Sequence, residues 1–135
     1  MTLDDKILSK VSYIKECISK LKTYINSYDD SDEVYELAME RISEKIIESA
    51  ISINKIVLEE EGIYSESYYD SFIKLSEANI FKKDFSKNLA STAGFRNRLA
   101  HDYMDINKEI SIKTMSKLPR LYKKYLKGII KYLEK

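Results

Sequence analysis

Apolar residues recur at intervals of three and four along most of this chain, a spacing that predicts amphipathic helices. The sequence has only 3 glycines and 1 proline among 135 residues, so it offers few sites for tight turns. We therefore expect an all-α fold, an antiparallel bundle of four to five helices. We find no repeat period and no linker, and we treat residues 1–135 as one domain.

Five helices are predicted, over about residues 3–26, 33–60, 66–77, 82–103 and 108–133. Residues 29–32 supply a loop and an N-cap before the second helix, which stops near Gly62. The apolar side of the second helix carries Met39, Ile42, Ile46, Ala50, Ile53 and Val57, and the third helix presents Tyr69, Phe72, Ile73 and Leu75. Pro119 should kink the fifth helix or start a new segment, because proline lacks an N–H and its ring clashes with the preceding turn.

The fifth predicted helix carries two opposed stripes. Its packing side consists of Met115, Leu118, Tyr122, Tyr125, Ile129 and Tyr132. The other side, which we call the basic stripe, consists of Lys113, Lys117, Arg120, Lys124, Lys127 and Lys131. Residues 107–135 hold a formal charge of +7, whereas the other 106 residues hold −6. This asymmetry indicates either a polyanionic partner for the basic stripe or a lysine face that is simply solvated.

Cysteine use and the lack of long apolar runs restrict the class of protein. Cys17 is the only cysteine, which excludes an internal disulfide framework and favours a reducing compartment. Asp4 and Asp5 stand near the start in place of a basic run, and no apolar stretch approaches the length of a signal-peptide core or a membrane span. We expect a cytoplasmic protein with no membrane segment.

Arg96 occupies a position in the fourth helix where leucine would be expected. The seam of this helix runs through Phe85, Leu89, Thr92, Arg96, Leu99 and Tyr103 at alternating spacings of four and three. A desolvated guanidinium without a partner is costly, so Arg96 should either meet a carboxylate or open onto a polar cleft. The first arrangement would be a purely structural ion pair, and the second would offer a cation to a phosphate.

His101, the only histidine of the chain, follows Arg96 by five positions. Because a helix turns about 100° per residue, Arg96 and His101 point about 140° apart, whereas Tyr103 lies within about 20° of Arg96. Arg96 and His101 can act on one ligand only if the helix ends between them or a second copy completes the site, which favours a two-fold homodimer. Asn97, four residues before His101, is placed to hydrogen-bond the imidazole.

An arginine and a histidine at one cleft suit the cleavage of RNA by its own 2′-hydroxyl. That reaction needs a base for the 2′ proton, an acid for the departing 5′-oxygen and positive charge for the phosphorane, and it needs no metal. Imidazole suits either proton transfer, and a guanidinium grips phosphate through two parallel hydrogen bonds. One chain offers one imidazole, so the second role falls to a partner chain or to water. A lone histidine on a helix can also be structural.

A motif around these residues resembles a known family. The run Phe95-Arg96-Asn97-Arg98-Leu99-Ala100-His101-Asp102-Tyr103 is similar to the R-x-x-x-x-H-x-Y motif of HEPN ribonuclease toxins of the HepT type. Upstream segments are similar to the second and third helices of that family, among them Ile47-Glu48-Ser49-Ala50, Glu61-Gly62 and Ser67-Tyr68. The resemblance covers roughly residues 35–110.

The resemblance implies a helical bundle that dimerises with both motifs facing a shared cleft, metal-independent RNA cleavage, and tRNA as the substrate class. Arg96 and His101 match the catalytic pair, and Tyr103 matches the tyrosine to which a cognate minimal nucleotidyltransferase antitoxin attaches AMP. Glu48 matches an acidic position, although the helical wheel puts it on the polar side of the second helix. We keep Glu48, as a partner for Arg96, and Asn97 as supporting residues. No metal or cofactor is expected.

Three interpretations remain open. In the first, the chain is a homodimeric endoribonuclease toxin in which His101 transfers protons, Arg96 stabilises the phosphorane and the basic stripe tracks the RNA backbone. In the second, it is a non-catalytic HEPN module that docks a nucleotidyltransferase and does not depend on His101. The third, a purely structural helical dimer, leaves both the inward arginine and the motif unexplained.

Overall fold

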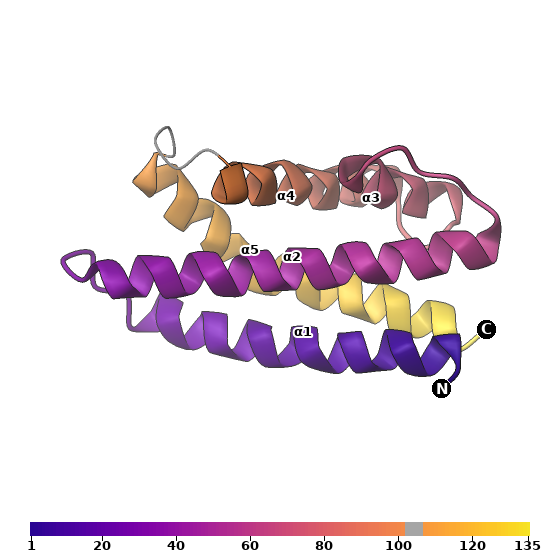
Figure 1. Cartoon of the computed structure of the whole chain (residues 1–135), viewed down its shortest axis with the longest axis horizontal. Helices are drawn as coiled ribbons and strands as arrows, with labels where there is room; N and C mark the ends of the chain where they lie inside the picture. The colour runs from indigo at the N-terminus through magenta and orange to yellow at the C-terminus, as the bar shows by residue number, and fades with distance from the viewer. Residues whose placement is uncertain (102–106) are drawn as a thin grey trace.

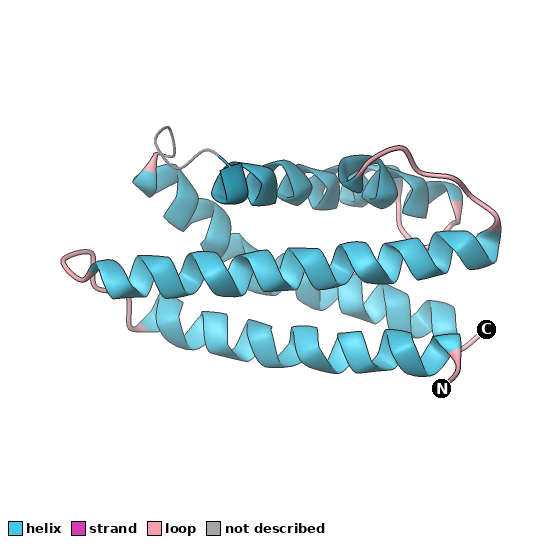
Figure 2. Ribbon diagram, in the orientation of Figure 1, coloured by secondary structure: helices cyan, strands magenta, loops and turns pink. Residues whose placement is uncertain are grey.

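A computed structural model describes residues 1–101 and 107–135 of the chain, and these residues form five helices. The helices are α1 (Leu3–Asn26), α2 (Glu33–Glu61), α3 (Tyr68–Glu77), α4 (Lys83–His101) and α5 (Lys108–Leu133). The described ranges contain no strand, so the all-α prediction is confirmed (Figure 2). Helices α1 and α2 run side by side in opposite directions, α3 and α4 lie along the other side of α2, and α5 crosses behind α2 (Figure 1).

Short polar side chains fix several helix ends. The Asp5 N–H donates to Thr2 Oγ1 at 3.1 Å, and the Thr2 N–H donates to Asp5 Oδ2 at 3.2 Å, which forms a reciprocal capping box at α1. Asp32 Oδ1 accepts from the Val34 N–H at 3.0 Å, so the predicted cap of α2 is confirmed. Gly62 ends α2 with a φ of 69°, the left-handed conformation that glycine adopts most easily, and the predicted stop is also confirmed.

Three predictions about individual helices were wrong. Helix α3 begins at Tyr68 and not at residue 66, because the Ser67 hydroxyl accepts from the Asp70 N–H at 3.0 Å and caps the helix there. Tyr69, predicted on the apolar side of this helix, is 50% exposed because it lies on the flank of the buried face of α3. Helix α5 continues through the buried Pro119, so the alternative of a new segment is also wrong, and a kink there stays a prediction.

Helix α2 is the central element of the bundle. It packs against each of the other four helices, so its buried surface is broader than the single stripe that the sequence predicted. Of the predicted stripe, Ile42 is partly buried and the others are fully buried. The structure adds Ser43, Ile47, Ile51, Asn54 and Leu58.

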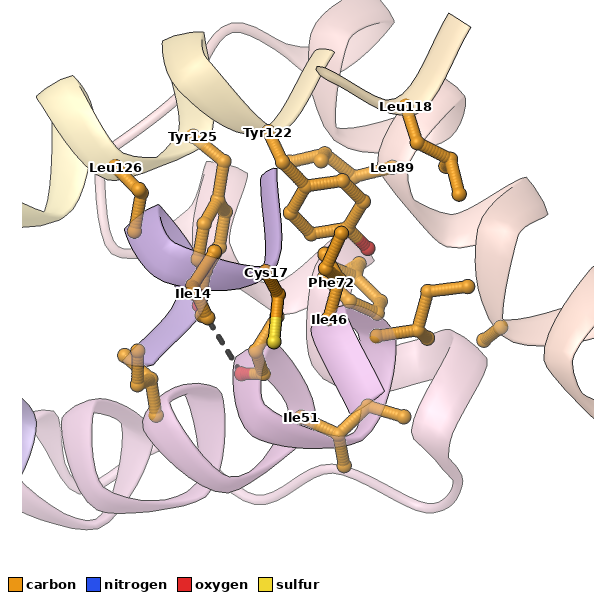
Figure 3. Close-up of a cluster of buried hydrophobic side chains, with 14 of the residues drawn as sticks. Ile14, Cys17, Ile46, Ile51, Phe72, Leu89, Leu118, Tyr122, Tyr125 and Leu126 are labelled. Atoms are coloured by element: carbon orange, nitrogen blue, oxygen red, sulfur yellow. Dashed lines mark hydrogen bonds between the residues drawn. The ribbon is translucent and has the colours of Figure 1, made fainter. Parts of the chain in front are cut away.

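The core around α5 is aromatic and contains a buried polar network. Tyr122 and Tyr125 are fully buried among side chains from the other four helices (Figure 3). The Tyr125 hydroxyl donates to Asn54 Oδ1 at 2.6 Å and lies 3.0 Å from the Ala50 carbonyl, while Asn54 Nδ2 donates to Ser71 Oγ at 3.1 Å. Burial raises the pKa of Tyr125 well above its ordinary value, so its hydroxyl stays protonated. This network fixes α3 against α2 and α5.

The pairing of α3 with α4 sets the position of the candidate site. These two helices lie against each other along one side of α2 (Figure 1). The N-terminal end of α3 therefore faces the C-terminal half of α4, where the motif lies. In the part of the chain that the structure describes, no helix has the length and apolar character needed to cross a membrane.

Candidate active site on α4

Arg96 lies at the centre of the candidate site, with its side chain 21% exposed. Its Nη2 atom lies 3.8 Å from Glu48 Oε2 on α2, and its Nη1 atom donates to Asn97 Oδ1 at 3.4 Å. Its Cζ atom lies 5.9 Å from the centroid of the Tyr68 ring on α3. The Nε atom is buried and has no hydrogen-bond partner among the described residues. Three elements therefore surround one cation whose hydrogen-bonding capacity is only partly used.

The sequence left two outcomes open for Arg96, a carboxylate partner or a polar cleft, and the structure shows both. Glu48 supplies the carboxylate, and its side chain is 33% exposed. The helical wheel placed Glu48 on the polar side of α2, but because α2 is surrounded by the other helices that side also meets α4. The pair is too exposed to be worth much stability.

A pocket of about 830 Å³ opens between the start of α3 and the end of α4. It is lined by Ser67, Tyr68, Tyr69, Arg96, Asn97, Arg98 and His101. Arg96 and His101 thus reach the same pocket from one chain. Helix α4 continues through His101, so the alternative that the helix ends between the two residues is wrong.

His101 is exposed at the last described residue of α4. The predicted hydrogen bond from Asn97 to the imidazole is absent from the described part of the chain, where Asn97 accepts from Arg96 instead. The imidazole is therefore open to solvent and to a ligand in the pocket. Tyr103, the predicted modification site, lies outside the described residues.

The basic stripe lies on the surface, as its pattern predicted. All six of its side chains are exposed. Three of them, Lys117, Arg120 and Lys124, line a second pocket of about 800 Å³ between α4 and α5. The Nζ atom of Lys124 lies 5.3 Å from the centroid of the Phe85 ring, within reach of a cation–π interaction.

The site contains a proton-transfer group, a cation and room for a ligand. An exposed imidazole can accept or donate a proton, and a guanidinium can stabilise charge on a phosphorane. Within residues 1–101 and 107–135, no group of three or more histidine, cysteine, aspartate or glutamate side chains is placed to hold a metal ion.

Sequence reasoning missed the part of the pocket that comes from α3. Ser67, Tyr68 and Tyr69 line it, but the sequence pattern grouped Tyr69 with the apolar residues of the third helix and gave no role to the other two. A signal was available. Tyr68 and Tyr69 are adjacent aromatic residues in the first turn of a helix, and adjacent helical positions point about 100° apart, so at most one of them can lie at the centre of the buried face.

The order and packing of the five helices define the class of fold, which is the HEPN fold. A solved structure described as the tri-AMPylated Shewanella oneidensis HEPN toxin in complex with MNT antitoxin matches with a TM-score of 0.85. The match covers 96% of this chain and 98% of that one at 23% sequence identity. It shows that the two chains share a fold.

Sequence similarity shows the family to which this chain belongs. The family described as "Ribonuclease HepT-like" matches residues 14–128. A tRNA nuclease HepT of Aphanizomenon flos-aquae is 30% identical over 131 residues, which are 94% of this chain and 89% of that protein. An mRNA nuclease HepT of Shewanella oneidensis is 30% identical over 117 residues, 82% of this chain and 85% of that one. The chain therefore belongs to the HepT-like ribonuclease family, and it is a ribonuclease by class.

Proposed function

We propose that this chain is the toxin of a toxin–antitoxin pair and acts as a metal-independent endoribonuclease on RNA, with tRNA as the expected substrate. The observation that carries the proposal is the shared pocket of Arg96 and His101, with Arg96 held by Glu48 at 3.8 Å. Similarity to a tRNA nuclease HepT supports the substrate class, whereas the relative described as an mRNA nuclease makes mRNA the competing substrate.

The reaction follows from the groups in the pocket. The 2′-oxygen of the RNA attacks the adjacent phosphorus while a base removes its proton, and the bond to the 5′-oxygen breaks as an acid protonates that oxygen. His101 takes one of these proton transfers, and Arg96 binds the phosphorane oxygens. Glu48 and Asn97 hold the guanidinium as positioning residues.

The second proton transfer calls for a second imidazole or for water, because each chain has one histidine. We propose that residues 1–135 act as one domain and that two copies pair so that both pockets face a shared cleft. This pocket is open to solvent in the single chain, so a second copy can reach it.

Regulation is proposed to act through Tyr103. A cognate minimal nucleotidyltransferase would attach AMP to its hydroxyl, and the added phosphate would compete with RNA for Arg96. A solved structure of a tri-AMPylated HEPN toxin with its MNT antitoxin supports this mode of control. After incubation with antitoxin and ATP, mass spectrometry should find adenylate on Tyr103 and none on the Tyr103→Phe variant. Adenylate on a different tyrosine would contradict the assignment.

The nuclease proposal is tested by tRNA cleavage with the purified chain in the presence of a metal chelator. We expect cleavage by the wild type, no cleavage by His101→Ala, and unchanged cleavage by Lys22→Ala, an exposed residue of α1 that serves as the matched control. Equal cleavage by the wild type and His101→Ala would reject the role of the imidazole. If no variant cuts RNA while the chain binds the nucleotidyltransferase, the docking module becomes the better explanation.

A further inference from the structure

Two tyrosines on α3 are more exposed than aromatic side chains usually are. Tyr68 is 54% exposed and Tyr69 is 50% exposed. Both line the pocket that contains Arg96 and His101. The chemistry described above gives neither side chain a role.

Tyr68 is held by a rigid support. It is the first residue of α3, directly after the cap Ser67, and its carbonyl accepts from Ser71 Oγ at 2.7 Å. Ser71 in turn accepts from Asn54 Nδ2 at 3.1 Å, and Asn54 is fully buried. The exposed ring is therefore attached to a fixed helix end that belongs to the buried network.

The geometry leaves the Tyr68 ring available to a ligand. The Arg96 Cζ atom lies over the ring at 5.9 Å from its centroid, close to the outer limit of about 6 Å for a cation–π contact, and Tyr68 still remains 54% exposed. The pocket of about 830 Å³ falls in the range of about 300–1,000 Å³ for small-molecule sites, which leaves room for a nucleotide. A phosphate bound at Arg96 would thus bring its own base beside Tyr68.

We propose that Tyr68 forms a nucleobase subsite in which one unpaired base of the RNA stacks on its ring while the adjoining phosphate binds Arg96. Tyr69 adds a second aromatic surface at the edge of the same pocket. This inference rests on the proposed RNA cleavage. Because every base has an aromatic face and a paired base is already stacked, the subsite selects unpaired nucleotides with little regard to sequence.

The chain contains no tryptophan, so the Tyr68→Trp variant carries a single fluorophore at the proposed subsite. In a His101→Ala background that prevents cleavage, we expect an eight-nucleotide single-stranded RNA to quench this tryptophan by stacking. An abasic ribose-phosphate chain of the same length should not quench it, and a duplex of the same sequence should quench it weakly. The matched control is Tyr64→Trp, at a position that is 78% exposed and does not line this pocket.

Affinity gives an independent measurement. Tyr68→Leu in the same background should weaken binding of the labelled single-stranded RNA by about 5- to 100-fold, the usual effect of removing one base-stacking interaction. Tyr68→Phe, which keeps the aromatic face, should bind like the parent, and all three proteins should bind the abasic chain equally.

The outcomes separate the two proposals. Equal quenching at positions 64 and 68, or normal RNA affinity of Tyr68→Leu, rejects the subsite and leaves the nuclease proposal standing. Weaker binding of the abasic chain by Tyr68→Leu also rejects it, because Tyr68 would then act by positioning Arg96. If the His101→Ala parent does not bind RNA and the wild-type chain does not cut it, the proposed function fails and the subsite fails with it.

Discussion

Arg96 is the residue at which folding and the proposed chemistry have opposite requirements. It occupies a seam position of α4 with its side chain only 21% exposed, and its buried Nε atom has no hydrogen-bond partner in the described ranges. A buried donor without a partner costs stability, by about 1–3 kcal/mol. A nuclease needs that free capacity, because a guanidinium whose donors are all used cannot bind a phosphorane.

Replacing Arg96 with methionine should therefore separate stability from activity. We expect the free energy of unfolding of Arg96→Met to be unchanged or raised by up to about 1 kcal/mol, because an apolar side chain fits a seam position and the Glu48 carboxylate, 33% exposed, stays solvated without its partner. RNA cleavage should fall by roughly 10²-fold or more, since the phosphorane loses its cation. Urea unfolding and cleavage rates provide the two measurements.

The matched comparison is Leu99→Ala, one turn along the same seam. Leu99 is 4% exposed, so its truncation should lower the unfolding free energy by about 2–5 kcal/mol. A large loss of stability in Arg96→Met, similar to that of Leu99→Ala, would mean that the ion pair with Glu48 is structural and that the seam needs it.

The sequence predicted that Arg96 needs a polar environment but not the composition of that environment. Periodicity along α4 marks Arg96 as inward without information about the neighbouring helix. Glu48 seemed solvent-facing because a helical wheel assumes one buried side, whereas α2 packs against four helices. The pocket role of Tyr68 and Tyr69 was missed because the register of α3 against α4 depends on tertiary contacts. Caps such as Asp32 and Gly62 were predictable because they act within a few residues.

At the scale of helices, two glycines within helices should respond in opposite ways to the same substitution. A Cβ atom at Gly128 of α5 would overlap the ring of Phe81, which is already confined by Phe85 and Tyr125 at centroid distances of 5.0 and 5.7 Å. A Cβ atom at Gly94 of α4 would meet only Arg98 Nη1, at 3.9 Å. Glycine at 128 is therefore required by packing, and glycine at 94 is not.

We expect Gly128→Ala to lower the unfolding free energy by about 1–3 kcal/mol, because the partly buried Phe81 ring must move against its packed neighbours. Gly94→Ala should raise it by about 0.5–1 kcal/mol through helix propensity. Chemical denaturation of both variants under one set of conditions measures the difference. Stabilisation by Gly128→Ala would show that Phe81 has space to move and that its packing on α5 is loose.

At the scale of the whole molecule, the surface charge of α5 should determine the salt dependence of RNA binding. Lys117, Arg120 and Lys124 are exposed and share one pocket. Changing all three to glutamine should reduce the slope of log affinity against log salt by about 0.7 for each RNA phosphate that these side chains neutralise. The control changes Lys15, Lys20 and Lys22 of α1 to glutamine. These lysines are also exposed, and replacing them removes the same charge. Equal slopes for the two triple variants would show that the basic stripe is a solvated face with no special role in RNA binding.

Pairing of two chains gives the sharpest test of the mechanism, because each chain has one histidine and the reaction has two proton transfers. We mix wild-type and His101→Ala chains at equal amounts and allow subunit exchange. If each shared cleft needs both imidazoles, only dimers of two wild-type chains cut RNA, and activity should fall to about a quarter of the wild-type value. If one imidazole and water suffice, mixed dimers retain one working site and activity should be about half. To verify that exchange is complete, a tagged wild-type chain is mixed in the same way and recovered in pairs with untagged chains. An activity of about half then contradicts the two-imidazole cleft, because incomplete exchange no longer explains it.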